Sequence, residues 1–252
     1  MNSIQRFTLL LSLVFGLGTV SAQITSGTID YNESFTFELG DWMPKDRKDE
    51  MLKRMANGDF DRAGRLTFSA DAFSYSQLAQ EAPAGGRGRG SWMMRNQENP
   101  DIFYTSIGDS MVTDRRRVMD QAFIMEDKWV TPKWNIANMK VGMKELPLPT
   151  QLATAVSIEG DTLTAYFTPS IPLGIGPRGY GGLPGAIVYL KVVKDGRTTE
   201  YKMTTMQPNA PDANPEKPAD EKIITRKEFE KQQKRAMEMM ERRRRGWERG
   251  RG

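Results

Sequence analysis

The sequence contains neither cysteine nor histidine. Without cysteine the chain has no disulfide, no thiolate metal site and no Cys-His nucleophile pair. Without histidine it also lacks a ligand of most zinc and copper sites and the commonest general base. Only carboxylate, lysine and tyrosine chemistry remains. We therefore expect a protein that is not an enzyme, with no metal and no cofactor; a carboxylate-dependent hydrolase is the enzymatic alternative.

Long apolar runs are also scarce. Beyond residue 22, no stretch approaches the ~18 apolar residues that a membrane-spanning helix needs. Within residues 1–22, Arg6 precedes the apolar stretch Phe7–Val20, and Val20-Ser21-Ala22 resembles a small-residue cleavage site. We interpret 1–22 as a signal peptide; the alternative, a membrane anchor, lacks a stop-transfer flank. The mature protein is then exported, to the periplasm, the outer membrane or the medium, without a transmembrane span.

The formal net charge of +4 hides a division between two regions. Residues 222–252 contain 12 Lys/Arg and 5 Asp/Glu, a net charge of +7. Once Arg6 is removed with the signal peptide, residues 23–221 carry a net charge of −4. A basic tail thus follows a mildly acidic body. Because nucleic acid belongs to another compartment, we expect the tail to contact an anionic membrane surface or an envelope protein, unless it only solubilises the chain or folds back on the body.

Short apolar-alternating segments dominate residues 28–205. In 28–39 one face carries Ile29, Tyr31, Phe35, Phe37 and Leu39 and the other face is polar, which is typical of a half-buried antiparallel strand. Further strands are predicted at 65–69, 72–78, 102–106, 110–119, 122–126, 133–136, 152–158, 162–168, 186–194 and 198–205. Between the first two strands, Pro44 opens a predicted helix that Gly58 ends.

Two tight turns support this interpretation. Glu159-Gly160-Asp161 and Asp195-Gly196 each separate two predicted strands, and Asp-Gly is a strong hairpin signal. Many strands with tight turns and one helix predict a mainly β (α+β) fold. Specifically, we expect an antiparallel meandering curved sheet or half-barrel with one packed helix, followed by a C-terminal basic helix.

A loop rich in glycine and proline lies between the strands 162–168 and 186–194. Prolines fix φ and glycines permit positive φ, so such a loop can be long and still adopt one shape. Its candidate interaction residues are Pro169, Pro172, Gly176, Pro177, Gly182, Leu183, Pro184 and Gly185. These residues supply backbone geometry and no acid or base. The loop is therefore either a structural turn or a docking surface, and catalysis is the weakest alternative.

The C-terminal region has two parts. Residues 207–221 carry four prolines and mixed charges and are predicted to be an extended, unfolded linker. Thr225 and Glu228 form a capping box that predicts a helix from there to about residue 245. Along that helix, an apolar line is formed by Phe229, Ala236, Met240 and Trp247. The candidate contacts for an anionic surface are Arg242, Arg243, Arg244 and Arg245.

Five motifs carry a family resemblance: Phe123–Asp127, Trp134–Ile136, Ala165–Pro172, Gly176-Pro177 and Gly182–Gly185. Their order and spacing over residues 27–206 resemble the GLPGLI family of bacterial envelope proteins. Tyr166 and Ala186 replace the family's Trp and Leu, and the cysteine that members often carry is absent. The resemblance implies an exported β-rich domain without an assigned reaction and, by analogy of fold, a half-barrel like those that shield acyl chains.

Together these observations predict four regions: a signal peptide at 1–22, a GLPGLI-like β-rich domain at 23–206, a Pro-rich linker at 207–221 and a basic amphipathic helical tail at 222–252. For the function we expect a non-catalytic interaction or accessory protein of the bacterial envelope. The alternative is a periplasmic carrier that holds a lipid or another apolar ligand on the concave face of its sheet.

Overall fold

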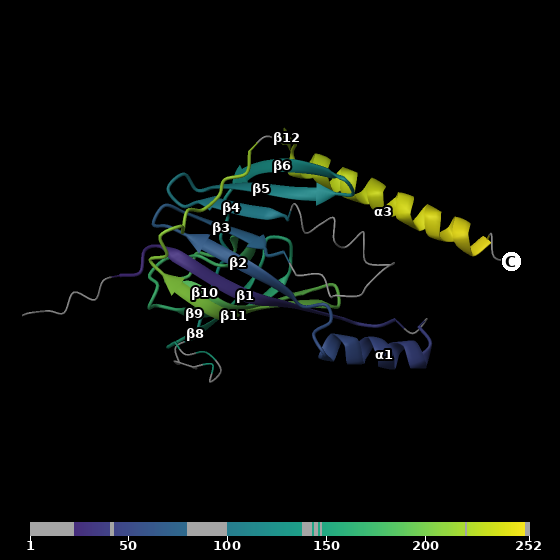
Figure 1. Cartoon of the computed structure of the whole chain (residues 1–252), viewed down its shortest axis with the longest axis horizontal. Coiled ribbons are helices and arrows are strands. Elements are labelled where there is room, and N and C mark those ends of the chain that lie inside the picture. The colour runs from purple at the N-terminus through teal and green to yellow at the C-terminus, as the bar shows by residue number, and fades with distance from the viewer. Residues whose placement is uncertain are drawn as a thin grey trace, which may run out of the picture.

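The computed structural model describes residues 23–40, 43–79, 100–137, 143, 146, 148–219 and 221–249 (Figure 1), with the backbone alone from 243 onward. The segment 1–22, interpreted above as a signal peptide, lies outside these residues. None of the helices in the described part of the chain is long and apolar enough to cross a bilayer.

The described strands form one sheet of twelve strands, in the order β12-β6-β5-β4-β3-β2-β1-β11-β10-β9-β8-β7. Their bounds are β1 Gly27–Phe37, β2 Arg62–Phe68, β3 Ala72–Gln77, β4 Ile102–Ser106, β5 Met111–Val118, β6 Gln121–Lys128, β7 Asn135–Ile136, β8 Gln151–Val156, β9 Thr162–Thr168, β10 Ala186–Lys194, β11 Arg197–Pro208 and β12 Lys222–Ile223. One antiparallel meander runs from β1 to β6 and a second from β7 to β11, and the pair β1–β11 joins them. The predicted mainly β, meandering fold is confirmed.

Tight turns make the hairpins possible. Gly160 adopts φ +88° between β8 and β9, and Asp195 and Gly196 adopt φ +46° and +70° between β10 and β11. Positive φ at both central residues is the geometry that matches the twist of paired strands. Both turns predicted from the sequence are therefore present.

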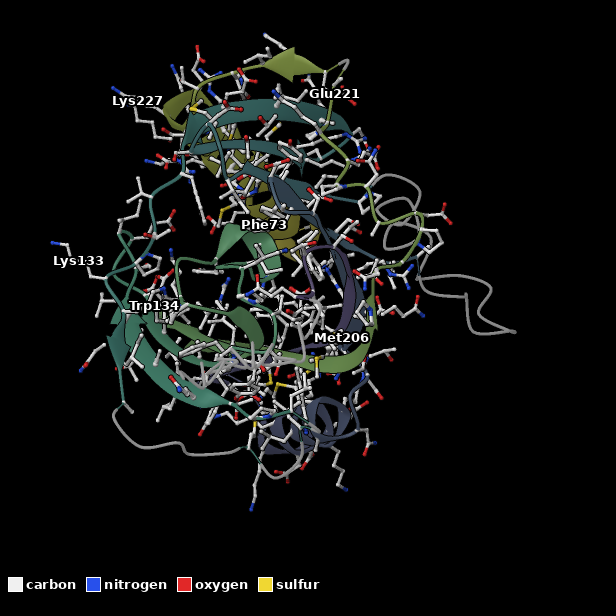
Figure 2. The ribbon with its side chains drawn as sticks, turned by 90° about the vertical axis from the view of Figure 1, so that its left-hand side faces the viewer. Phe73, Lys133, Trp134, Met206, Glu221 and Lys227 are labelled. Carbon is white, nitrogen blue, oxygen red and sulfur yellow. The ribbon has the colours of Figure 1, made fainter. Side chains whose placement is uncertain are left out.

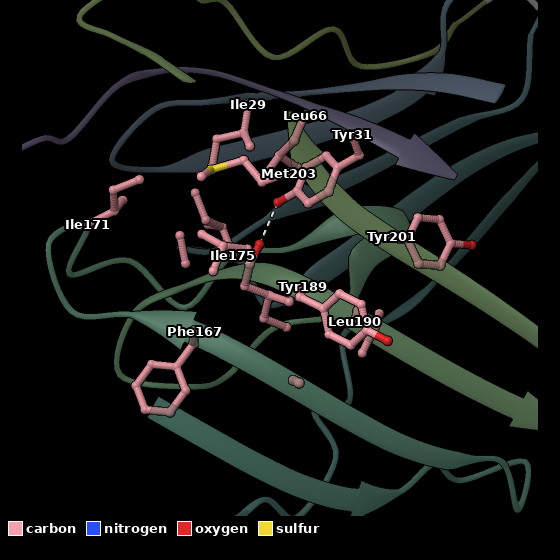
Figure 3. Close-up of a cluster of buried hydrophobic side chains, with 14 of the residues drawn as sticks. Ile29, Tyr31, Leu66, Phe167, Ile171, Ile175, Tyr189, Leu190, Tyr201 and Met203 are labelled. Carbon is pink, nitrogen blue, oxygen red and sulfur yellow. Dashed lines mark hydrogen bonds between the residues drawn. The ribbon is translucent and has the colours of Figure 1, made fainter. Parts of the chain in front are cut away.

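Alternation along each strand gives the sheet an inner and an outer face. On β1 the odd-numbered residues Ile29, Tyr31 and Glu33 are buried on the inner face, whereas their even-numbered neighbours are partly exposed. The inner faces of β1, β2, β3, β9, β10 and β11 contribute most of the main core, together with side chains of the glycine-proline loop (Figure 3). Across this core the Tyr31 hydroxyl donates a hydrogen bond to the Ile187 carbonyl (Figure 3).

The sheet curves around its inner face, and the segment between β6 and β7 closes the remaining side. In Figure 2, Phe73 lies in the interior and Trp134 on the left-hand side of the molecule, across from Met206 of β11. Two indoles on this segment reach the glycine-proline loop: Trp129 Nε1 donates to the Gly179 carbonyl at 2.9 Å, and Trp134 Nε1 to the Gly181 carbonyl at 2.8 Å. The closing segment and the loop are thereby fixed to each other.

The two α-helices of the described residues, α1 and α3, extend beyond the same end of the sheet (Figure 1). α1 (Lys45–Ala56) is the helix expected to pack on the sheet, yet none of its residues is buried, because charged residues dominate it and leave no continuous apolar face. α3 (Arg226–Arg249) begins at the predicted capping box: Glu228 Oε2 accepts from the Thr225 N–H at 2.9 Å, and Thr225 Oγ1 accepts from the Glu228 N–H at 3.2 Å.

Candidate functional site

The glycine-proline loop, residues 169–185 between β9 and β10, folds into the interior of the curved sheet. Ile171, Ile175 and Leu183 are 0%, 0% and 3% exposed and belong to the main core. Within the loop, the Gly182 N–H donates a hydrogen bond to the Gly174 carbonyl at 2.9 Å. The Ile187 N–H of β10 donates to the Ile175 carbonyl at 2.9 Å and so ties the loop to the sheet. The loop is thus an integral part of the core.

The eight predicted interaction residues of the loop divide by exposure. Pro169, Pro172, Gly182 and Pro184 are exposed, whereas Gly176, Pro177, Leu183 and Gly185 are buried. Gly182 adopts φ +84°, and a Cβ there would lie 2.6 Å from Thr131 Cβ, so glycine is required twice over. Gly185 has no positive φ, but a Cβ there would collide with the Thr168 backbone. The exposed residues remain the candidates for a contact.

At its centre the loop presents a charge to the interior. η1 (Pro177–Gly179) holds Arg178 at φ +52°, a left-handed conformation that L-residues rarely adopt. The Arg178 Nε lies 3.7 Å from Oε1 of Glu33, which projects from β1 and is 0% exposed. The Arg178 guanidinium also lies 4.8 Å from the centroid of the Phe103 ring on β4. A strained residue therefore positions a cation between a buried carboxylate and an aromatic face.

Besides Arg178, Glu33 has polar neighbours on β3 and β11. Gln77 Nε2 donates to Glu33 Oε2 at 2.8 Å. The rings of Tyr75 and Tyr201 meet edge to face 6.0 Å apart, and burial, together with the Glu33 charge, raises the pKa of both hydroxyls. Gly64 on β2 makes room for the Tyr75 ring, because a Cβ there would collide with the Tyr75 hydroxyl. The arrangement keeps both tyrosines neutral.

Several buried atoms around Glu33 lack a hydrogen-bond partner. They are Glu33 Oε1, Tyr75 OH, Thr105 Oγ1 and Arg178 Nε. Buried polar atoms are normally paired, and each unpaired one lowers stability. We define the polar cluster as Glu33, Tyr75, Thr105, Arg178 and Tyr201. It contains four of the six buried side-chain atoms without a hydrogen-bond partner among the described residues.

A second group of charges lies beyond Phe103. Burial raises the pKa of Asp114 on β5 to about 6, and Asp101 adds to this effect, whereas Arg116 and Arg226 oppose it. Burial lowers the pKa of Arg116. Asp101 is occupied elsewhere, because its Oδ1 accepts from the Arg117 N–H at 3.0 Å. A carboxyl with a pKa near 6 can exchange protons at neutral pH. The charged groups around Asp114, however, are engaged with other residues of the protein, as the hydrogen bond of Asp101 to the Arg117 backbone shows.

The basic tail is buried at its start and exposed further along. Phe229 and Ala236 are 2% and 5% exposed, whereas Met237, Met239 and Met240 are 63%, 49% and 56% exposed. The predicted apolar line is therefore buried at its N-terminal end and open at Met240. Arg242 is exposed, and the side chains of Arg243, Arg244, Arg245 and Trp247 lie outside the described residues.

Sequence reasoning missed the polar cluster. Glu33 falls on the apolar face of β1, between Tyr31 and Phe35, and this interruption of the alternation was the available signal. Arg178 had no local signal, because its partner Glu33 is distant in sequence. Among the described residues, no group of three or more acidic side chains could hold a metal ion.

Comparisons with known proteins give one family-model match over part of the chain and a fold. A family model described as "Protein of unknown function (Porph_ging)" matches residues 111–189. Two structures of PNGF-II, in space groups P21 and C2, resemble the chain with TM-scores of 0.51 and 0.50 at 9% and 10% identity. They cover 84% and 83% of this chain and 34% and 33% of theirs, so the chain spans about a third of the length of PNGF-II. At this identity the likeness shows the fold alone. No curated protein matches the chain.

Proposed function

We propose that the protein is an exported, non-catalytic accessory protein of the bacterial envelope that binds a partner through its C-terminal helix. Export is supported by the signal-peptide pattern of residues 1–22. The envelope assignment is supported by the resemblance to the GLPGLI family, and the family model that matches residues 111–189 is likewise one of unknown function. The observation that carries the proposal is the division of α3 into a docked and an exposed half.

The exposed half of α3 has the composition of a contact surface. Three methionines, Met237, Met239 and Met240, are about half exposed or more. Methionine adapts its shape to irregular apolar partners. After Glu241, Arg242 opens a run of four arginines, and arginines bind carboxylates and phosphates through paired hydrogen bonds. An apolar patch beside a basic run fits an acidic envelope protein or an anionic headgroup surface.

The alternative, a carrier of an apolar ligand, is less well supported. The inner face of the sheet, where such a ligand would lie, is occupied by Ile171, Ile175 and Leu183 of the chain's own loop. A ligand there would have to displace the loop and its hydrogen bonds to Trp129 and Trp134. The non-catalytic part of the proposal rests on the engaged carboxyls: Glu33 pairs with Arg178 and Gln77, and Asp101 binds the Arg117 backbone.

An affinity capture from the bacterial envelope tests the proposal. The bait is the full mature chain, compared with a variant in which Arg242–Arg245 are all replaced by glutamine, which keeps helix propensity and removes the charge. We expect a specific envelope protein or anionic lipid with the parent chain and at least a tenfold lower recovery with the variant. Apolar lipid recovered equally by both baits, without a protein, would support the carrier instead.

A further inference from the structure

The last strand differs from every other strand of the sheet. β12 pairs with β6 in parallel, whereas all other pairs are antiparallel. It covers β6 only at Phe123 and Ile124, where Lys222 and Ile223 are their partners, and the Ile224 N–H adds one hydrogen bond to the Ile124 carbonyl at 2.9 Å. On its other side β6 pairs with β5 over all eight of its residues. The edge of β6 is thus covered by a short segment that arrives from far along the chain.

A single aromatic side chain anchors this segment. We define the C-terminal arm as residues 221–229, which follow the proline-rich stretch and end in the first turn of α3. Phe229 packs edge to face on Phe123, with ring centroids 6.4 Å apart, and Met125 completes a small core cluster separate from the main core. The Arg116 guanidinium lies 4.9 Å from the centroid of the Phe229 ring. Val118 of β5 and Ile224 of the arm also pack against this cluster. The receiving surface is therefore one aromatic, one thioether, one partly buried valine and one cation.

The remaining contacts of the arm are ion pairs with partly exposed partners. Glu221 lies 3.5 Å from Arg115, and Arg226 lies 3.5 Å from both Asp127 and Glu159. The Arg226 and Asp127 side chains are 40% and 53% exposed. Such pairs orient a segment but contribute little to stability. The charges of the arm thus have a fixed order: the acidic Glu221 precedes β12 and the basic Arg226 follows it.

These contacts are few for a segment that closes a sheet edge. An open edge accepts any extended peptide, and proteins use this property to bind partners by strand addition. The arm fills the edge of β6 with two ladder residues and one anchor, and the separate cluster around Phe229 can open without disturbing the main core. Its affinity relies on the tether, which keeps a high local concentration of the arm.

We propose that the edge of β6, with Phe123, Met125 and Arg116, is a peptide-docking site and that the C-terminal arm is its tethered, displaceable occupant. The partner is an extended protein segment with the chemistry of the arm: an acidic residue, two or three β-branched residues, a basic residue and then an aromatic residue. Displacement of the arm frees α3 together with its exposed methionines. The inference rests on the proposed accessory function and names the kind of partner it serves.

The test measures binding of a fluorescent synthetic peptide with the sequence of residues 221–232 to the full mature chain. In the parent chain the tethered arm competes, so binding is weak. Phe229→Ala in the chain weakens the competitor, and the peptide is expected to bind at least about tenfold tighter. A peptide in which Phe229 is replaced by alanine is the matched control, and it is expected to bind neither chain. Circular dichroism confirms that the variant keeps its sheet.

A disulfide lock gives a second test that leaves Phe229 in place. The chain has no cysteine, and Ile124 and Ile223 are direct ladder partners, so I124C/I223C can form one new disulfide. The oxidised form is expected to show no peptide binding, and the reduced form, in which the tethered arm can leave the edge, to bind the peptide at least as well as the parent chain does. Equal binding by the parent and F229A chains, or by the oxidised and reduced forms, would overturn the docking site. Either result leaves the envelope capture by Arg242–Arg245 untouched, so the two proposals fail separately.

Discussion

Two irregular segments, the glycine-proline loop and the C-terminal arm, complete the sheet in contrasting ways. The loop contributes three fully packed apolar side chains, Ile171, Ile175 and Leu183, and its carbonyls receive two tryptophan indoles. The arm contributes one, Phe229, and two ladder residues. The loop is tied into the main core, whereas the arm has a small core cluster of its own.

The contrast shows that regular secondary structure does not indicate how firmly a segment is held in the folded protein. The loop has almost no regular structure, yet removing it would expose the centre of the fold. The arm has a strand and the first turn of a helix, yet its backbone pairs only with the edge of β6, and it reaches the β8–β9 turn through the ion pair of Arg226 with Glu159. The number of buried apolar side chains decides which segment unfolds only when the whole protein unfolds and which segment unfolds locally. Four predictions test this comparison, beginning with the largest effect.

Gly182→Val is expected to destabilise the whole fold by about 3–4 kcal/mol, because a left-handed φ is costly for an L-residue and a branched side chain cannot fit beside it. The φ is +84°, and a Cβ would lie 2.6 Å from Thr131. Chemical denaturation measures the change. Gly108→Val is the matched control, because a Cβ at Gly108 meets nothing within 4 Å. If both variants unfold alike, the loop is not part of the core.

Arg178→Met is expected to cost about 2–3 kcal/mol, since it removes the cation that pairs with the buried Glu33 carboxylate and leaves that charge with only the hydrogen bond from Gln77. The double variant Glu33→Gln/Arg178→Met removes the unpaired charge and should recover part of the loss. A double-mutant cycle on denaturation midpoints measures the coupling. Additive losses would show that the two charges do not interact.

Asp114 gives the stability a dependence on pH. Its folded-state pKa of about 6 exceeds its ordinary value of 3.8, so the folded protein binds this proton more tightly. The stabilisation is complete below about pH 4 and is lost as the pH rises through 6. Asp114→Asn should flatten stability across that window and raise it at pH 7.5 by roughly 1–2 kcal/mol. Thermal melts at pH 4, 5, 6 and 7.5 follow the effect; parallel curves would refute it.

Phe229→Ala should change the body least. A buried phenylalanine in a core costs ~3–5 kcal/mol when truncated, but here the loss cannot exceed what docks the arm. We expect the main unfolding midpoint to move by about 2 °C or less. Proteolysis between residues 209 and 229 should become at least tenfold faster. A midpoint that falls as far as in Gly182→Val would make the arm part of the core and remove the contrast.

Much of the sheet could be predicted from the sequence because its signals are local. The alternation of 28–39 and the Asp195-Gly196 turn act within a few residues, and they correspond to β1 and to the β10–β11 hairpin. The Thr225–Glu228 capping box acts over three residues and is present. Residues 209–219 belong to the stretch 207–221 that was predicted to be an extended, unfolded linker, but they contact the sheet. The Glu216 N–H donates to Ser74 Oγ at 3.2 Å, and Lys217 Nζ lies 3.8 Å from Glu126 Oε1.

The candidate sites were hidden because they depend on distant pairings. Glu33 and Arg178 come together only when β1 and the glycine-proline loop occupy the same interior. The parallel pairing of β12 has no signature in two residues, and its partner β6 lies about a hundred residues earlier. α1 was predicted to pack on the sheet, but none of its residues is buried. The order of elements along the chain shows that a helix follows β1, but it does not show whether that helix lies against a face of the sheet or beyond its end.

The central pair β1–β11 has a consequence for how the chain is made. β1 is synthesised first, but its partner on one side, residues 197–208, comes near the end. Until then Ile29 and Tyr31 have only the β1–β6 meander for cover, and the other half of the interior is missing. During synthesis the nascent chain therefore holds an incomplete half-sheet with exposed apolar surface until β11 is made. Its yield should depend on factors that shield unfolded chains, and a circular permutant beginning at β7 should shorten that wait.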